Sequence, residues 1–227
     1  MWPETPSELI RVQRELSKAR PTPWHSTGPR PLVGACFACF ARTARGRAGE
    51  PGWAGAVLMY GNRRLVAAAV VRGQAQATYQ PGLLALREGR LLETALRELP
   101  VQPEVLIANA TGRDHPQRAG LALHLGAVLG LPSIGVTDRP LLAAGSEPAR
   151  ERWATSPLYI SGAEVARMLR TRLDAHPVVV HPGWRTDLET AVAMVRATVR
   201  RARTPEPLRR ARRQARWARA VDEGRAA

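Results

Sequence analysis

An apolar strand predicted at residues 104–109 leads into a loop that contains a glycine and a His-Pro pair. A loop of this kind at the end of a buried strand is typical of the rim of an active site. The first polar side chain there is the neutral amide of Asn109, and the nearest carboxylate, Asp114, comes five residues later. The segment therefore has the setting of an active site, but no charged side chain stands where the strand ends.

The composition indicates a globular, strongly basic chain. Its 227 residues are 44% hydrophobic and carry a net charge of +15, and the cationic side chains are arginines except for Lys18. Arginine forks match the geometry of phosphate, so this charge favours DNA or RNA as a partner. The alternative is an arginine-rich surface with no binding role. No apolar run approaches the ~20 residues of a membrane helix, and the N-terminus carries no secretory signal, so a cytoplasmic protein is expected.

The only cysteines, Cys36 and Cys39, lie on a predicted interior strand. Residues at this spacing on a strand point to opposite faces, which argues against a disulfide and against a redox pair. No second cysteine pair is present to complete a zinc site. Both cysteines are therefore expected to be small core residues.

Hydrophobic periodicity predicts an α/β fold with a mixed sheet flanked by helices. Strands are predicted at residues 32–41, 54–60, 64–73, 104–109, 133–137 and 176–182, and helices at 8–20, 83–99, 116–129, 162–172, 188–201 and 207–219. The first three strands form an antiparallel meander with a tight turn at Gly61 and Asn62, and the strand-helix-strand unit that follows favours parallel pairing. We expect one domain over residues 1–204, including the first helix, and an arginine-rich surface helix or tail at 205–227.

Four spaced motifs connect the chain to a known family. They are YQPGLLALRE at residues 79–88, GRDHPQRAGLALHLG at 112–126, LPSIGV at 131–136 and TDLETA at 186–191. In this order, together with the opening helix and the Pro-Glu-Pro around Glu206, they resemble endonuclease V. The resemblance implies a ribonuclease-H-like fold with an antiparallel meander followed by parallel strands. It also implies recognition of inosine in DNA or RNA and Mg²⁺-dependent cleavage of a nearby phosphodiester.

The resemblance assigns the active-site positions, and this chain departs from the family at most of them. Glu88 matches a family carboxylate, whereas Cys36 stands in place of an Asp on the first strand. Asn109 occupies a further carboxylate position, Asp138 replaces a Lys, and Trp184 replaces a His. A thiol is a soft, poor ligand for Mg²⁺, and an amide brings no charge. Glu88 is thus the retained catalytic carboxylate in an altered site.

These departures leave three hypotheses. The leading one is a nucleic-acid-binding pseudonuclease that has lost Mg²⁺-dependent cleavage and binds Mg²⁺ weakly or not at all. The alternative is an active endonuclease for deaminated DNA or RNA with a rearranged metal site of Glu88, Asn109 and Asp138, with Asp114 as a further candidate ligand. The third is a non-catalytic scaffold that binds a protein partner and whose basic surface is incidental.

The resemblance also implies a set of nucleic-acid-binding residues. Tyr79 stands in the place of a wedge tyrosine that stacks against an opened base step. Gly82, Leu84, Gly135 and Thr137 fall where the family forms a pocket for the flipped base. The alternatives are an ordinary turn tyrosine at Tyr79 and tight helix-strand packing at the other four positions.

Three further features have both a functional and a structural interpretation. His115, which precedes a proline at a strand-to-helix turn, is expected to serve as a structural hydrogen-bonding group. Trp184 with Arg185 stacks on a base or phosphate at the site mouth, or else plugs the vacated pocket. The arginine-rich run at residues 208–219, with Trp217, tracks a phosphate backbone or forms a solvated helix face.

Overall fold

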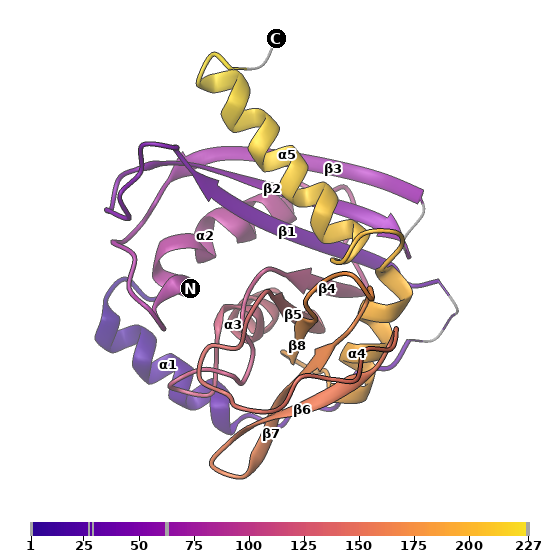
Figure 1. Ribbon diagram of the computed structural model, residues 1–227. Helices are drawn as coiled ribbons and strands as arrows, with labels where there is room; N and C mark the ends of the chain where they lie inside the picture. Colours follow the sequence, from indigo (N-terminus) through magenta and orange to yellow (C-terminus); the bar gives the residue numbers. More distant parts are fainter. Residues whose placement is uncertain (1, 27, 29, 62–63, 226–227) are drawn as a thin grey trace.

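The computed structural model describes residues 2–26, 28, 30–61 and 64–225 and contains an eight-stranded mixed sheet with helices on both faces (Figure 1). The strands are β1 (Leu32–Phe40), β2 (Pro51–Tyr60), β3 (Arg64–Gln74), β4 (Val105–Ala108), β5 (Ser133–Thr137), β6 (Thr155–Ile160), β7 (Ala163–Leu169) and β8 (Val178–Pro182). The helices are α1 (Pro6–Lys18), α2 (Leu84–Arg97), α3 (Leu121–Leu129), α4 (Leu188–Thr198) and α5 (Glu206–Asp222). The strand order is β3-β2-β1-β4-β5-β8-β7-β6.

The sheet combines the predicted antiparallel meander with a parallel centre. Strands β1, β2 and β3 are antiparallel, whereas β4 pairs in parallel with β1 and β5 pairs in parallel with β4. The carboxyl ends of β4 and β5 therefore lie at one edge of the sheet, so Asn109 and Asp138, which directly follow them, are brought to that edge. Cys36 pairs with Ala108 and lies level with this edge.

Two hydrophobic cores lie on opposite faces of the sheet. Leu106 and Ile107 are adjacent on β4, so their side chains point to opposite faces. Leu106 belongs to a core with residues of α1, α2 and α3, whereas Ile107 belongs to a core with residues of α4 and α5. Cys36 lies in the first core, and Cys39 packs against α5, so the predicted opposite orientation of the two free thiols is confirmed.

Helix α5 lies directly on the antiparallel part of the sheet, crossing β1 and β2 (Figure 1). Leu208, Ala211 and Ala215 are buried on its inner face, so the predicted surface helix has one packed side. The close contact requires a glycine on β2, because a Cβ at Gly55 would lie 2.5 Å from the carbonyl oxygen of Ala211. Within the described residues no helix has the length and apolar character needed to cross a bilayer.

Two sequence-based helix assignments differ from the structure. The helix predicted at residues 162–172 is strand β7, which pairs with β6 and β8 on its two sides. Ser161 and Gly162 both have positive φ, 51° and 77°, and this left-handed pair reverses the chain into a hairpin. Pairing on both sides therefore outweighs the local helical spacing. The helix predicted from residue 116 begins only at Leu121, and Asn62 of the predicted tight turn lies outside the described residues.

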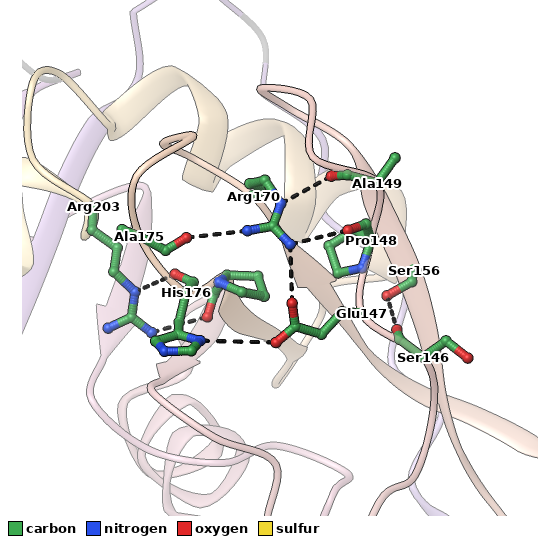
Figure 2. Close-up of polar contacts among 10 residues, drawn as sticks. Ser146, Glu147, Pro148, Ala149, Ser156, Arg170, Ala175, His176 and Arg203 are labelled. Atoms are coloured by element: carbon green, nitrogen blue, oxygen red, sulfur yellow. Dashed lines mark hydrogen bonds and ion pairs between the residues drawn. The ribbon is translucent and has the colours of Figure 1, made fainter.

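Arg170 ties an irregular segment to the end of β7 (Figure 2). Its side chain is only 5% exposed, and its nitrogens donate to the carbonyl oxygens of Ala149, Pro148 and Ala175 at 2.9, 3.0 and 3.2 Å. It also pairs with Glu147 at 3.1 Å. This buried guanidinium therefore supplies the hydrogen bonds that the segment around residues 147–149 does not obtain from a regular strand or helix.

Replacing Arg170 with alanine should destabilise the protein by about 3 kcal/mol, because three carbonyl groups, including the buried one of Pro148, lose their donor at once. The measurement is the free energy of unfolding in urea. Arg172→Ala is the matched control, since Arg172 is exposed and pairs with the exposed Asp174, and it should cost less than about 1 kcal/mol. Equal losses in the two variants would contradict the assigned role of Arg170.

Candidate functional site

A cavity of about 230 Å³ lies at the carboxyl edge of β4 and β5. We call it the Tyr79 cavity; it is lined by Gln13, Tyr79, Gln80, Pro81, Gly82, Leu84, Ala85, Asn109, Ala110, Thr111, His115, Leu121, Thr137 and Leu141. Four of the residues assigned to base recognition, Tyr79, Gly82, Leu84 and Thr137, are thus brought together. Tyr79 is 55% exposed, so its ring is accessible for stacking.

Gly135, the remaining residue assigned to base recognition, lies beneath the cavity and not on its wall. It is buried in β5, and a Cβ there would lie 2.1 Å from the carbonyl oxygen of Ala110. The loop after β4 therefore packs directly on the β5 backbone. This geometry fits the packing interpretation of Gly135, which shapes the cavity by letting the loop approach.

The turn at Gly82 connects three elements around the cavity. Gly82 has φ of 79°, in the left-handed region where glycine is favoured. Its carbonyl oxygen accepts from His115 Nε2 at 2.9 Å and from Gln13 Nε2 at 3.2 Å. His115 Nδ1 accepts from the backbone N–H of Gln117, so the Nε2 of a neutral ring carries the proton. Burial lowers the pKa of His115, which keeps the ring neutral in this structural role.

Gln13 was missed by the sequence reasoning. It is 1% exposed and lies on the buried side of α1 with Leu9. A polar residue on the apolar stripe of an amphipathic helix was the available signal, since such a side chain needs a hydrogen-bond partner. Its contact with Gly82 joins α1 to the cavity.

Asp114 does not reach the edge where a metal would bind. Its side chain is fully buried, and its oxygens accept the backbone N–H groups of Leu141, Leu142 and Ala143 at 2.7 to 2.8 Å. The carboxylate thus fixes the segment after β5. The hypothesis that Asp114 supplies a replacement metal ligand is therefore not supported by its position.

Glu88 and Cys36 form the interior side of the candidate site. Glu88 projects from α2 and is partly exposed, and burial raises its pKa to about 7 against the opposing effect of Arg87. The Cys36 thiol is buried, and burial followed by the nearby Glu88 charge raises its pKa well above the usual value. Cys36 is therefore a neutral thiol at physiological pH. Among the residues that the structure describes, Glu88 belongs to no group of three or more potential metal ligands.

Asn109 is exposed at the end of β4 and contacts a residue from the far end of the chain. Arg212 Nη2, on α5, donates to Asn109 Oδ1 at 3.2 Å. A guanidinium group therefore lies on the side chain that occupies a family carboxylate position. Sequence spacing gave no signal of this contact, because the two residues are separated by 103 positions.

Asp138, which follows β5, is exposed and forms an ion pair with Arg203. Arg203 Nη1 lies 2.6 Å from Asp138 Oδ1, and Arg203 also donates to the carbonyl oxygens of His176 and Pro177. Figure 2 shows Arg203 beside His176. Asp138 lines a separate cavity of about 350 Å³ with Glu147 and His176. It does not line the Tyr79 cavity, so the structure does not gather Asp138 with Asn109 there.

Trp184 lies away from the Tyr79 cavity, at the beginning of β5. Its backbone N–H donates to Ser133 Oγ, and its carbonyl oxygen accepts from Ser133 N–H, both at 2.9 Å. It lines a hollow of about 280 Å³ together with Arg20, Arg113 and Arg185. The structure therefore separates Trp184 from Asn109 and Thr137, which lie at the opposite end of the central strands.

The residues present do not fit an Mg²⁺ site. Within residues 2–26, 28, 30–61 and 64–225, no group of three or more His, Cys, Asp or Glu side chains is arranged to hold a metal ion. Glu88 is close to half protonated near neutral pH, and Asn109 is neutral and bonded to a cation. Mg²⁺ needs anionic oxygen ligands to offset its dehydration, and the other acid at this edge, Asp138, is already paired with Arg203.

Comparison with known proteins identifies the family. The family model of Endonuclease V matches residues 29–213. The Endonuclease V of Nocardia farcinica is 38% identical over 216 residues, which cover 95% of this chain and 93% of that protein. The crystal structure of Endonuclease V from Streptomyces avermitilis superposes with a TM-score of 0.85 at 35% identity and covers 99% of this chain and 96% of that one.

A more distant structure adds to the likeness in fold. Endonuclease V from Ciona intestinalis, in complex with a DNA 24mer containing an inosine followed by a ribo-adenosine, superposes with a TM-score of 0.79 at 20% identity, covering 96% of this chain and 98% of that one. Endonuclease V structures have a ribonuclease-H-like fold, so the predicted fold class is confirmed. The family is one of endonucleases that generally use a divalent metal. This chain, matched along nearly its whole length, belongs to the endonuclease V family.

Proposed function

We propose that this family member binds inosine-containing or single-stranded nucleic acid at the Tyr79 cavity and does not cleave it with Mg²⁺. The observation that carries the proposal is the edge of the sheet beside Glu88, where Cys36 and Asn109 provide no second carboxylate and Arg212 contacts the Asn109 amide. Catalytic groups that act as a unit fail together when one is lost. Cleavage is therefore lost, while the cavity that would receive a base is formed.

Three features support nucleic acid as the partner. The net charge of +15 favours phosphate, and the exposed ring of Tyr79 suits stacking on a base. A relative in the family, from Ciona intestinalis, is known in complex with inosine-containing DNA. We propose that the ligand is DNA or RNA, that binding does not depend on Mg²⁺, and that the protein acts in the cytoplasm.

The competing function is an active endonuclease with a rearranged site of Glu88, Asn109 and Asp138. It is favoured by the family itself, since relatives such as the Nocardia farcinica protein bear the name Endonuclease V. The deciding assay incubates inosine-containing DNA and RNA with Mg²⁺ or Mn²⁺ and follows the products on a denaturing gel. Product that disappears in Glu88→Ala would establish the enzyme and reject the proposed loss of cleavage. No product in either metal supports the proposal.

Replacing Tyr79 with alanine should weaken the binding of an inosine-containing oligonucleotide about tenfold, because one stacked base contributes roughly 1–3 kcal/mol. Fluorescence anisotropy without added Mg²⁺ measures the affinity. Tyr159→Ala is the matched control, since Tyr159 is 44% exposed on β6 and does not line the cavity. A Tyr79→Ala protein that binds as tightly as the Tyr159→Ala protein would remove Tyr79 from the binding site.

A further inference from the structure

Two arginines on α5 lie one helical turn apart beside the end of β4. The guanidinium carbon of Arg212 lies 5.0 Å from the ring centre of Phe37, and that of Arg216 lies 5.6 Å from the same ring centre. Arg212 Nη2 also donates to Asn109 Oδ1 at 3.2 Å. The ring and the amide thus position the Arg212 guanidinium next to the residue that borders the Tyr79 cavity.

Neither guanidinium forms an ion pair among the residues that the structure describes; Asp138 acts on Arg212 from a greater distance and is itself paired with Arg203. Three other arginines in this part of the chain form ion pairs: Arg203 with Asp138, and Arg209 and Arg210 with Glu206. By contrast, the Nε atom of Arg212 is buried and has no hydrogen-bond partner in the described part of the chain. A buried donor without an acceptor is unfavourable and rare in folded proteins. The arrangement therefore has the donors of an anion site without its anion.

The electrostatics of the pair point in the same direction. Both guanidinium groups lie against the Phe37 ring, and burial, followed by the charge of Arg216, lowers the pKa of Arg212 against the opposing effect of Asp138. An arginine guanidinium nevertheless stays protonated at physiological pH. An anion bound between the two groups would relieve this repulsion, and phosphate matches the guanidinium fork in shape and charge.

We propose that Arg212 and Arg216 form a metal-independent phosphate-binding site, which holds a phosphodiester of nucleic acid bound at the Tyr79 cavity. The identity of the phosphate as part of a nucleic acid rests on the proposed function. Asn109 lines the cavity and contacts Arg212, so it joins the two sites. A strand with a base in the cavity would present its backbone phosphate to these arginines.

The neutral side chain of Asn109 fits this role. A carboxylate at this position would repel a phosphate and would pair with Arg212, removing the charge that the phosphate needs. An amide accepts from Arg212 through its oxygen and keeps its NH₂ group, which can donate to a phosphate oxygen. With Asn109 in place of a carboxylate, position 109 suits the binding of an anion and not of a metal ion.

Binding of inorganic phosphate tests the site directly. The dissociation constant is measured by calorimetric titration at constant ionic strength for the natural protein and for Arg212→Ala, Arg216→Ala and Arg213→Ala. Arg213 is the matched control, because it is an exposed arginine on the same helix and neither contacts Phe37 nor bonds to Asn109. We expect the first two variants to bind phosphate about tenfold more weakly, and the Arg213 variant to bind it as the natural protein does.

A loss of phosphate binding in Arg216→Ala would not be explained by misfolding. Arg216 is exposed, and its guanidinium forms no hydrogen bond or ion pair within the described residues, so its loss leaves the packing of α5 in place. If Arg212→Ala and Arg216→Ala bind phosphate as tightly as Arg213→Ala, the proposed site is wrong.

A second arm distinguishes a nucleic-acid phosphate from a free anion. The affinity for an inosine-containing oligonucleotide is measured over a range of salt concentrations, and loss of a phosphate contact should lower the slope of log K against log salt by about one in Arg212→Ala relative to Arg213→Ala. Equal slopes would overturn the assignment to a phosphodiester. If the natural protein binds no oligonucleotide while phosphate binding still depends on Arg212, the proposed function fails and the anion site stands.

Discussion

Replacing Cys36 and Asn109 together by aspartate should create an Mg²⁺ site that the natural protein lacks. Without metal, the double variant should be less stable than the natural protein by about 2–4 kcal/mol, because the side chain of residue 36 is only 1% exposed and a buried carboxylate beside Glu88 is unfavourable. With Mg²⁺ at a hundred times its dissociation constant, binding should return about 2.7 kcal/mol. The measurement is the free energy of unfolding with and without Mg²⁺.

The matched control moves one aspartate to the other face of the sheet. Cys39 also lies on β1 but packs against α5, outside the core that contains Cys36. Cys39→Asp with Asn109→Asp should be less destabilised, because Cys39 is less buried and lies near Arg216 and Arg219, and it should not be rescued by Mg²⁺. If Mg²⁺ stabilises the natural protein as much as the Cys36→Asp, Asn109→Asp variant, then the residues present do hold the ion, and the proposed loss of the metal site is wrong.

Arg212 should modify this result. An aspartate at position 109 would form an ion pair with the guanidinium that now contacts the amide, and this cation would compete with Mg²⁺ for the carboxylate. Adding Arg212→Ala to the double variant should therefore strengthen Mg²⁺ binding further. Any cleavage of inosine-containing nucleic acid should appear first in this triple variant, which has clustered acids and lacks the guanidinium that contacts residue 109.

The site residues that directly follow a strand, or that lie within one sequence motif, could be predicted from the sequence. Asn109 follows β4 and Asp138 follows β5, as the alternation of apolar runs and turn residues indicated, and parallel pairing brings both to one edge. The cavity residues Tyr79, Gly82 and Leu84 were predicted from the resemblance to endonuclease V, through one continuous motif that covers a turn and the start of α2. Features set by short-range spacing were thus accessible to prediction.

Contacts between distant segments could not be predicted in the same way. Neither the pairing of Asp138 with Arg203 nor the contact of Asn109 with Arg212 leaves a periodic signal, because each depends on where a helix packs on the sheet. Asp114 is a comparable case, since its role depends on backbone N–H groups around residue 142 and not on any side-chain motif. The prediction of a helix at residues 162–172 was wrong for a related reason. Strand pairing of β7 with β6 and β8 outweighed the helical spacing of Val165 and Leu169.

The Glu88→Gln variant should become more stable than the natural protein as the pH rises. The folded-state pKa of Glu88 is raised from 4.5 to about 7, mainly by burial, so the folded protein binds more protons than the unfolded chain between these values. The favourable effect of a neutral Glu88 is fully present below pH ~4.5 and is lost as the pH rises through ~7. A pKa difference of one between the folded and unfolded states is worth about 1.4 kcal/mol, and partial exposure of the side chain reduces the total to about 2 kcal/mol.

The measurement is the difference in unfolding free energy between Glu88→Gln and the natural protein from pH 4 to pH 8. It should rise from near zero to about 2 kcal/mol, and groups such as His181, whose pKa burial lowers to about 4, cancel because both proteins contain them. Glu98→Gln, at the exposed end of α2, is the matched control for the substitution itself. A difference for Glu88→Gln that does not change with pH would show that its carboxylate is not desolvated.

The pH dependence of stability also tests whether Mg²⁺ binds beside Glu88. A bound divalent cation would hold the pKa of an adjacent carboxylate low. In the natural protein Arg87 lowers the pKa of Glu88, but burial raises it by more. Adding Mg²⁺ should therefore leave the pH dependence of the natural protein unchanged. In the Cys36→Asp, Asn109→Asp variant, saturating Mg²⁺ should remove the loss of stability between pH 4.5 and 7, because the ion keeps Glu88 ionised in the folded state. An Mg²⁺-dependent curve for the natural protein would instead place the ion beside Glu88.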